Sequence, residues 1–423
     1  MEQLYQIFLQ YPKISTDTRA ITPNSIFVCL KGANFDGNQF ALKALSLGCR
    51  YVITENQELD GHPDCIVVEN ALKTLQQLAL YHRQQLHIPV IGVTGTNGKT
   101  TTKELIHAVL SSKYKTVCTK GNLNNHIGVP LTLLSITNED EIAIVEMGAN
   151  HLGEIAQLCA LALPNYGVVT NIGHAHLEGF GSFENIKTTK FTLYDAVVKV
   201  NGIIFINADD PVLMDYPLQE NARYYAQDEC KEVHGKVEMM NPQLKITLCG
   251  ESLTTQMTGH YNLYNILAAT AIGICFGVEK QLIRQAIANY LPDNQRSQVI
   301  KKGTATFIAD YYNANPDSMR QALCNLAQID FPHKKAILGD MFELGNESRQ
   351  AHQDIVKLTE ELKIETCFAG QEFTKVASEK GRFFETLEAL NNVLDMNDYE
   401  NCITLVKGSR GVHLEKLKIF TKQ

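Results

Sequence analysis

Short apolar runs alternate with longer segments of helical periodicity along most of this chain. Brief apolar or β-branched runs are typical of buried strands, whereas apolar residues recurring every three or four positions indicate helices. In the first part of the chain, strand patterns at 25–30, 51–54 and 65–68 alternate with helical patterns at 40–47 and 71–83. We therefore expect a small α/β domain over residues 1–86. Its boundary precedes Pro89, because proline disfavours helix in the residue before it.

The same alternation continues through two further regions. Over residues 87–292 the strand patterns are 141–146, 166–171 and 202–207, and the closing helical patterns are 262–276 and 280–290. Over residues 293–423 the patterns are strands at 305–310, 336–339, 366–369 and 402–406, with helices at 317–327 and 347–362. Strands that alternate with helices predict parallel sheets covered on both faces. The last region therefore resembles a doubly wound, Rossmann-like domain, but it lacks GxGxxG and no dinucleotide is assigned to it.

Composition narrows the class of protein. The 423 residues carry a net charge of −8 with no basic stripe, which argues against a nucleic-acid partner. No apolar run reaches the roughly 18 residues of a membrane helix, so membrane insertion is not expected. The eleven cysteines include no CxxC pair, and the N-terminus lacks a signal-peptide pattern. Both features favour reduced thiols in a cytoplasmic protein, and we expect a monomer.

A glycine-rich segment joins the apolar run before residue 92 to a helical pattern at 103–110. Strand, glycine-rich turn and helix form the context of a phosphate-binding loop, in which glycines let main-chain N–H groups face the phosphates. The strict P-loop pattern requires glycine at Val93, so the observed GxxGxxGKT spacing indicates another ATP-using family. The candidate nucleotide-binding residues of this loop are Thr94, Gly95, Thr96, Asn97, Gly98, Lys99, Thr100 and Thr101.

Polar residues follow the next strand patterns. Glu146 ends one strand, and His174, His176 and Glu178 follow another. Ligands of open α/β sheets bind beyond the carboxyl ends of strands. Glu146 is therefore either a magnesium ligand or a solvated strand-end carboxylate, and the histidines are either functional or structural.

For three other sets of candidate functional residues, the sequence alone does not decide between a functional and a structural role. Asn262 and Asn265 share one helix face. Their side-chain amides either form hydrogen bonds with the edge of adenine or cap the helix. Lys190, on a helical pattern at 183–198, has the features of an ordinary surface lysine. The polar segment 310–318 either reaches a nucleotide or caps the helix that follows it.

A series of ordered motifs covers essentially the whole chain. They lie at 15–19, 30–37, 94–100, 121–132, 146–150, 175–182, 312–318, 338–345 and 407–411. Together they resemble the Mur ligases of peptidoglycan synthesis. The resemblance implies a small UDP-binding α/β domain, a central parallel-sheet ATPase domain with the P-loop, and a C-terminal Rossmann-like ligase domain.

The resemblance also implies roles for individual residues. Lys99, Lys190 and His176 are implied as catalytic. Magnesium is expected on Thr100, Glu146, His176 and Lys190, the last carrying CO2 as a carbamate. Beyond the loop, the implied nucleotide-binding residues are Asn262, Asn265, Arg296, Asp310 and Tyr312. The implied substrate-binding residues are Ser15, Thr16, Asp17, Arg19, Asp36, Asn124 and Asn125.

The implied activity is an ATP-dependent amide ligase that adds D-alanyl-D-alanine to a UDP-muramoyl-tripeptide through an acyl phosphate. The motifs at 312–318 and 338–345 favour this dipeptide-adding branch of the family. Two alternatives remain: a family member that adds a single amino acid, and a P-loop ATPase or switch that binds a partner.

Overall fold

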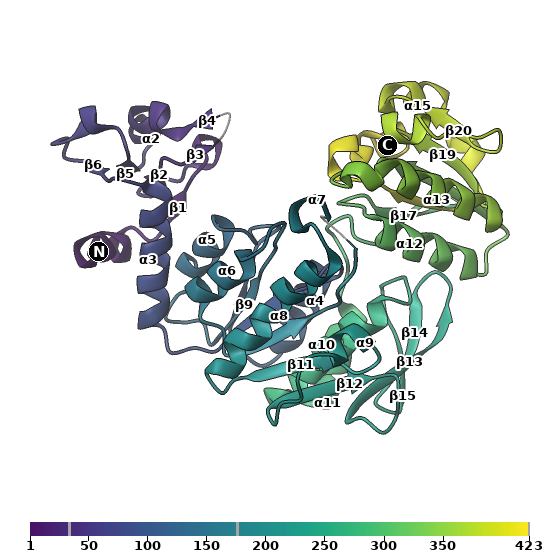
Figure 1. The fold of residues 1–423 in the computed structure, drawn as a ribbon, viewed down its shortest axis with the longest axis horizontal. Helices are drawn as coiled ribbons and strands as arrows, with labels where there is room; N and C mark the ends of the chain where they lie inside the picture. The colour runs from purple at the N-terminus through teal and green to yellow at the C-terminus, as the bar shows by residue number, and fades with distance from the viewer. Residues whose placement is uncertain (33–34, 175–176, 422–423) are drawn as a thin grey trace.

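The computed structural model describes residues 1–423 except 33–34, 175–176 and 422–423, and it contains three successive α/β domains. In Figure 1 the first domain lies at the upper left, the central domain below it and the C-terminal domain at the upper right. The described helices include none with the length and hydropathy of a membrane-spanning segment.

The first domain is a small parallel sheet with the strand order β1-β2-β5-β6. Its strands are β1 (Ile14–Ser15), β2 (Ile26–Val28), β5 (Tyr51–Thr54) and β6 (Cys65–Val67), with a hairpin of β3 (Lys31–Gly32) and β4 (Phe35–Asp36). Its helices are α1 (Glu2–Gln10), α2 (Ala41–Ser46) and α3 (Ala71–Gln85). Helix α1, which buries Leu4, Tyr5 and Phe8, was not predicted from the hydrophobic pattern of the sequence.

Helix α3 is the link between the first two domains. It packs against α1 on one side, and against α5 (Gly128–Leu134) and α6 (Glu154–Ala162) of the central domain on the other. The His82 ring of α3 shares hydrogen bonds with the Tyr5 hydroxyl, at 3.1 Å, and the main-chain oxygen of Ile136, at 2.9 Å. The expected boundary at residues 86–87 lies between α3 and β7 (Val90–Thr94).

The central domain is one large sheet with the order β15-β14-β13-β12-β11-β10-β7-β9-β8. The parallel part contains β8 (Thr116–Cys118), β9 (Ile142–Glu146), β10 (Tyr166–Val169), β11 (Ile203–Asn207) and β12 (Ala222–Ala226) beside β7. Helices α4 (Lys99–Leu110), α10 (Asn262–Cys275) and α11 (Lys280–Asn289) pack together on one face. Helices α5, α6 and α8 (Phe183–Lys199) cover the other, and the short α7 (Leu177–Phe180) and α9 (Pro211–Met214) complete the domain.

The expectation of a purely parallel central sheet was incomplete. Strands β13 (Val233–Met240), β14 (Leu244–Leu248) and β15 (Glu251–Thr254) extend it as an antiparallel meander. Leu244, Ile246 and Leu248 are buried in the period-two pattern of a strand with one covered face. Cys249 and Gly250 turn the last hairpin with φ of +48° and +87°, and a cysteine at such a position is a weak turn signal.

The C-terminal domain has a sheet of order β16-β17-β21-β18-β19-β20. Strand β16 (Gln298–Lys302) runs antiparallel to β17 (Ala305–Asp310), and β18 (His333–Gly339), β19 (Glu365–Ala369), β20 (Arg382–Phe384) and β21 (Cys402–Lys407) are parallel. The helices are α12 (Pro316–Gln328), α13 (Ser348–Glu361), α14 (Gln371–Thr374), α15 (Leu387–Val393) and α16 (Lys418–Thr421). One continuous cluster of buried apolar residues includes both α10 and α12, so the two larger domains pack together.

Candidate active site

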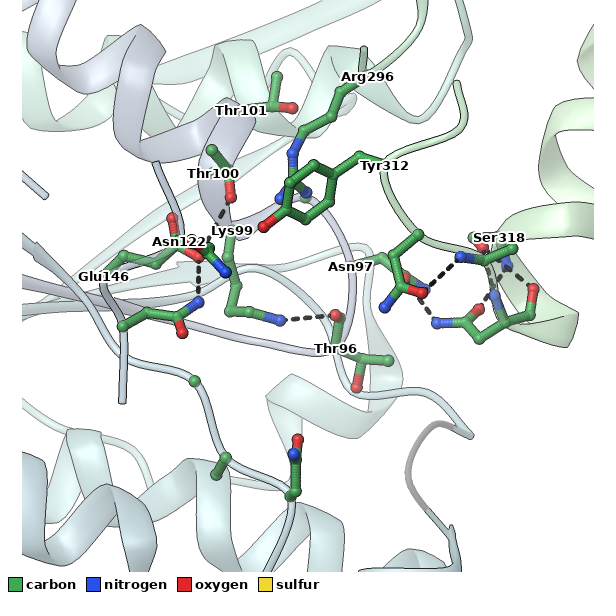
Figure 2. Close-up of a pocket in the computed structure, with 18 of the residues that line it drawn as sticks. Thr96, Asn97, Lys99, Thr100, Thr101, Asn122, Glu146, Arg296, Tyr312 and Ser318 are labelled. Carbon is green, nitrogen blue, oxygen red and sulfur yellow. Dashed lines mark hydrogen bonds between the residues drawn. The ribbon is translucent and has the colours of Figure 1, made fainter. Parts of the chain in front are cut away.

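The central and C-terminal domains enclose a cavity of about 500 Å³. Its lining includes residues 96–101 of the glycine-rich loop and the predicted nucleotide-binding residues Asn262, Asn265, Arg296, Asp310 and Tyr312. Thr94 does not line the cavity, because its buried hydroxyl donates to the main-chain oxygen of Met147 at 2.8 Å. Figure 2 shows Arg296 and Tyr312 beside Lys99 and Thr100.

Two glycines shape the loop between β7 and α4. Gly95 has φ of +146° and Gly98 has φ of +78°, conformations that other residues rarely adopt. A Cβ atom would lie 1.9 Å from Thr170 Oγ1 at Gly95 and 2.7 Å from Asn265 Oδ1 at Gly98. The close approach of the two neighbouring segments therefore requires glycine at both positions.

The segment after β10 braces the loop. The N–H of Thr96 donates to the main-chain oxygen of Asn171 at 2.9 Å, and the N–H of Asn97 to Asn171 Oδ1 at 3.0 Å. In return, the Thr170 hydroxyl donates to the main-chain oxygen of Asn97 at 2.6 Å. This bracing role of Thr170 and Asn171 was missed from the sequence, because nothing local links residues so far apart along the chain.

Lys99 begins α4 and folds back over the loop. Its Nζ donates to the main-chain oxygens of Gly95 at 2.8 Å and Thr96 at 2.9 Å. Burial lowers the pKa of Lys99 to about 8, the Glu146 carboxylate acts to raise it, and Arg296 lowers it further. A phosphate in the cavity would favour the ammonium form and offer it a stronger acceptor than the loop carbonyls.

Glu146, at the end of β9, has one carboxylate oxygen engaged and one unsatisfied. Its Oε1 accepts from Thr100 Oγ1 at 3.1 Å and from Asn124 Nδ2 at 2.8 Å. Its Oε2 is buried without a hydrogen-bond partner. A buried carboxylate oxygen beside a hydroxyl and a phosphate-binding loop suits magnesium, which is typically bound by one or two carboxylates plus substrate phosphates. Among the described residues, no group of three or more His, Cys, Asp and Glu side chains could hold a metal ion.

Lys190 lies on α8 and is only 3% exposed, so the view of it as an ordinary surface lysine was wrong. Its side chain makes no hydrogen bond or ion pair with another described residue. Burial, with a further contribution from the Lys99 charge, places the pKa of Lys190 well below the ordinary lysine value. Two lysines thus lie within electrostatic reach behind the phosphate loop.

The predicted metal ligand His176 lies outside the described residues. Its neighbour His174 is exposed and belongs to a contact between domains. The N–H of His174 donates to Asp317 Oδ2, at the start of α12, at 2.8 Å. Asn315 adds a second hydrogen bond between the domains, from its Nδ2 to Asn97 Oδ1 at 2.9 Å. The C-terminal domain therefore touches the phosphate loop directly.

Asn262 and Asn265 are buried at the start of α10. Asn265 Nδ2 donates to Asn262 Oδ1 at 2.8 Å, and Asn265 Oδ1 accepts from the Thr102 hydroxyl at 3.0 Å. Asn262 Nδ2 donates to the main-chain oxygen of Thr258 at 2.7 Å. These bonds fasten α10 to α4 beside Gly98, so this pair has a clear structural role. Its contact with adenine remains a prediction.

The C-terminal side of the cavity is cationic. Arg296 Nε is buried without a partner, and its guanidinium carbon lies 3.9 Å from the centre of the Tyr312 ring. Asp310 Oδ2 accepts from Lys407 Nζ at 2.6 Å. Lys407 also lines the cavity and was missed as a site residue, although it lies in a family-like motif. The ion pair ties β17 to its neighbour β21, so it positions this side of the site.

The predicted substrate residues divide into two groups. Asn124 and Asn125 line the cavity, and Asn125 Oδ1 also accepts from the N–H groups of Ile127 and Gly128 at the start of α5. Those of the first domain lie outside this cavity; they are Ser15, Thr16, Asp17, Arg19 and Asp36. Among them, Arg19 Nη2 and Asp17 Oδ2 form an exposed ion pair of 2.7 Å. Their role in substrate binding remains a prediction.

Gly98→Ala is expected to destabilise the protein and to weaken ADP binding. The substitution adds a strained backbone conformation, costing roughly 1–3 kcal/mol, and a clash with buried Asn265. Gly250→Ala is the matched control, because Gly250 has a similar φ of +87° with nothing within 4 Å of its added Cβ. Thermal unfolding with and without ADP would show the difference. Equal losses of melting temperature and unchanged ADP binding in both variants would contradict the assignment.

Comparison with known proteins agrees with this geometry. Three family models match successive parts of the chain. Residues 10–97 match the model described as "Mur ligase family, catalytic domain", residues 93–273 match "Mur ligase middle domain", and residues 295–410 match "Mur ligase, glutamate ligase domain". This chain belongs to the Mur ligase family. The resemblance and the three-domain α/β fold expected from the sequence are confirmed.

Individual relatives match this Mur ligase over nearly its full length. It is 33% identical to the UDP-N-acetylmuramoyl-tripeptide–D-alanyl-D-alanine ligase of Bacillus subtilis (strain 168), over 96% of this chain and 92% of the relative. Its fold is similar to a crystal structure of MurF from Acinetobacter baumannii, with 30% identity, a TM-score of 0.86 and coverage of 100% and 98%. It is also similar to MurF ligase from Thermotoga maritima in complex with ADP, with 27% identity, a TM-score of 0.83 and 97% of each chain covered.

Proposed function

We propose that this Mur ligase uses ATP to join D-alanyl-D-alanine to a UDP-N-acetylmuramoyl-tripeptide in the synthesis of peptidoglycan precursors. The observation that carries the proposal is a pair of unsatisfied atoms, Glu146 Oε2 and Arg296 Nε, at the cavity that the phosphate loop lines. A buried anion and a buried cation without partners are costly. A magnesium-bearing nucleotide would satisfy both. The full-length relatives supply the identity of the other two substrates.

Residues of the phosphate loop and of the C-terminal domain would bind ATP together. The loop N–H groups and Lys99 bind phosphate oxygens, and Arg296 supplies a second positive charge from the opposite wall. Thr100 and Glu146 would hold magnesium, with His176 and a Lys190 carbamate as further proposed ligands. When bound, magnesium would offset the repulsion between the phosphates and the incoming carboxylate.

The reaction then proceeds in two displacements. A carboxylate oxygen of the tripeptide bonds to the γ-phosphorus of ATP, and the bond from that phosphorus to the bridging oxygen breaks, releasing ADP. The amine of the dipeptide next bonds to the acyl carbon and loses a proton, and phosphate departs with the electron pair of the carbon–oxygen bond. The contacts of Asn97 with Asn315 and of His174 with Asp317 hold the domains together, which would protect the acyl phosphate from water.

The carbamate on Lys190 suits the environment of this side chain. Only a neutral amine reacts with CO2, and burial beside Lys99 favours the neutral form. Carbamylation would convert this neutral amine into an anion that pairs with the Lys99 ammonium. The same change would create an oxygen ligand for a metal ion.

Both walls of the cavity come from one chain, so the proposed catalytic unit is a monomer. Its proposed substrates are a nucleoside triphosphate and a UDP-linked precursor, which places the proposed activity in the cytoplasm.

The acceptor and donor can be tested with a panel of substrates. D-Alanyl-D-alanine should support ADP formation with a UDP-muramoyl-tripeptide, whereas D-alanine should do so poorly, because the longer dipeptide offers remote groups that hold its amine in place. Lysine and diaminopimelate should not replace it. Joining of either to a UDP-muramoyl-dipeptide would indicate a relative that adds one amino acid. ATP hydrolysis independent of any muramoyl peptide would indicate an ATPase or switch.

A further inference from the structure

The segment that joins the central and C-terminal domains carries one of the cations of the nucleotide cavity. This linker, residues 290–297, lies between α11 and β16. Arg296 belongs to it, with its guanidinium over the Tyr312 ring and its Nε buried without a partner (Figure 2). A connecting segment without regular structure does not by itself fix a long side chain. Other contacts must therefore determine where Arg296 points.

The backbone of the linker is strained on both sides of Arg296. Gln295 has φ of +61° and Ser297 has φ of +55°, in the left-handed region that residues other than glycine seldom adopt. Such conformations persist only where the surrounding structure holds the chain in place. The strain therefore indicates that the linker is fastened both before and after Arg296.

Ser297 fastens the end of the linker that follows Arg296. Its hydroxyl shares a hydrogen bond of 2.6 Å with the Tyr261 hydroxyl, and its N–H donates to Asp310 Oδ1 at 3.1 Å. Tyr261 directly precedes α10 of the central domain, and Asp310 ends β17 of the C-terminal domain. This end of the linker is thus bonded to both domains at once.

Glu104 fastens the end of the linker that precedes Arg296. Its Oε2 accepts from the Tyr290 hydroxyl at 2.6 Å and from Asn294 Nδ2 at 2.7 Å, and its Oε1 lies 3.4 Å from Nζ of the buried Lys103. Burial and the Glu104 charge raise the pKa of Tyr290 well above its ordinary value, so the hydroxyl keeps its proton and remains a donor. Asn294 Oδ1 is buried without a partner. Turning this amide over would bring its oxygen against the carboxylate, so Glu104 also fixes which way the amide faces.

Glu104 belongs to the same helix as the end of the phosphate loop. Helix α4 begins at Lys99, and Thr100 and Thr101, which line the nucleotide cavity, precede Glu104 by one turn. Residues three and four positions apart lie on the same side of a helix. One rigid helix therefore carries the loop lysine at its start and, one turn later, the carboxylate that holds the linker. The distance between the two cationic walls of the cavity depends on this connection.

We propose that Glu104 is a positioning residue, which ties the linker to α4 so that Arg296 faces Lys99 across the cavity before the nucleotide binds. The inference rests on the proposed function, since it explains how one wall of that nucleotide site is set. Arg296 and Lys99 repel each other, as the effect of Arg296 on the pKa of Lys99 indicates, so an anchor outside the cavity is needed until a phosphate joins them. Charges already in place cost less ordering when the ligand arrives.

Glu104→Ala tests the anchor through the affinity for adenylyl imidodiphosphate with magnesium, measured by calorimetry. We expect Kd to rise roughly tenfold, part of the roughly 100-fold that loss of a hydrogen-bonded charge can cause. Glu104→Gln should bind nearly as wild type, because its amide oxygen can still accept both hydrogen bonds. Asp195→Ala is the matched control, since the exposed Asp195 of α8 also accepts from a tyrosine hydroxyl, that of Tyr216 at 2.9 Å, away from the linker. It should leave Kd unchanged.

A double-mutant cycle separates positioning from a general loss of structure. Arg296→Ala should weaken binding at least as much as Glu104→Ala, and the double variant should bind no more weakly than Arg296→Ala alone, because Glu104 acts through Arg296. Tyr290→Phe, which removes one of the two hydrogen bonds and leaves no space, should show a smaller loss with the same dependence on Arg296.

Additive losses in the double variant would overturn the role of Glu104, as would a Kd for Glu104→Ala like that of Asp195→Ala. If Glu104→Ala does not fold, the cycle with Tyr290→Phe decides in the same way. Wild type that fails to bind the analogue at all would overturn the proposed function itself. Binding by wild type with additive losses would overturn only the positioning role.

Discussion

Lys99→Ala is expected to lower the rate of ADP formation at least ~100-fold, the scale for removing an electrostatic stabiliser from an active site. Lys99 begins α4 at the phosphate loop, and its Nζ donates to loop carbonyls at 2.8 and 2.9 Å. The substitution should leave the fold intact, because those bonds hold the lysine rather than the core. The measurement is coupled ADP release with D-alanyl-D-alanine and UDP-muramoyl-tripeptide present.

Lys73→Ala is a suitable control, because Lys73 is exposed on α3 of the first domain. It should retain wild-type turnover. Near-normal ADP release from a folded Lys99→Ala variant would contradict the assigned role of the loop lysine.

The same lysine predicts how ADP binding depends on pH. Its pKa is about 8 in the free protein, and a bound phosphate favours the ammonium. Below pH 8 the charge is already present, whereas above pH 8 binding must take up a proton. Calorimetry should therefore show the affinity of wild type for ADP falling above pH 8. The ADP affinity of Lys99→Ala should not fall in this way above pH 8. The same dependence of affinity on pH in both proteins would contradict the role of the Lys99 charge.

Lys190→Ala is expected to abolish detectable ligase activity, and acetate should restore part of it. The proposed carbamate is an anion on the end of a buried side chain, and removing the side chain leaves a space that a small carboxylate suits. Lys199→Ala, an exposed position on the same helix α8, should keep full activity and gain nothing from acetate. Activity assays over a series of acetate concentrations would distinguish the two variants.

The form of Lys190 can also be observed directly. A crystal structure with nucleotide and magnesium at neutral pH should show density for a carbamate continuous with Nζ. A bare ammonium there, or full activity of Lys190→Ala without acetate, would contradict the proposal.

Local sequence signals were enough for much of the fold. The strand expected at 305–310 is observed as Ala305–Asp310, and the helix expected at 347–362 as Ser348–Glu361. Helix α4 begins at Lys99, earlier than the pattern at 103–110, because residues 100–102 are threonines that carry no apolar period. The meander from β13 to β15 was missed because its turn at Cys249-Gly250 lacks a strong turn signal.

Side-chain roles were harder to predict, because they depend on segments far apart along the chain. From the sequence, the amides of Asn262 and Asn265 suited either adenine binding or helix capping. In the structure they hydrogen-bond to one another and fasten α10 to α4, and their contact with adenine is still a prediction. Lys190 has no local signal that distinguishes it from a surface lysine, and its burial results from the packing of α8. Lys407 is close to Asp310 only because β21 lies next to β17 in the sheet.

The sequence by itself determined the alternation of strands and helices and the phosphate loop, because periodicity and a glycine-rich turn act over a few neighbouring residues. It also determined the family, through motifs in a fixed order. Only the tertiary structure decided that Glu146 Oε2 and Arg296 Nε lack partners at one cavity, and that Glu104 is hydrogen-bonded to the linker that carries Arg296. Those facts depend on strand order and on contact between two domains, and neither is encoded in any local stretch of the chain.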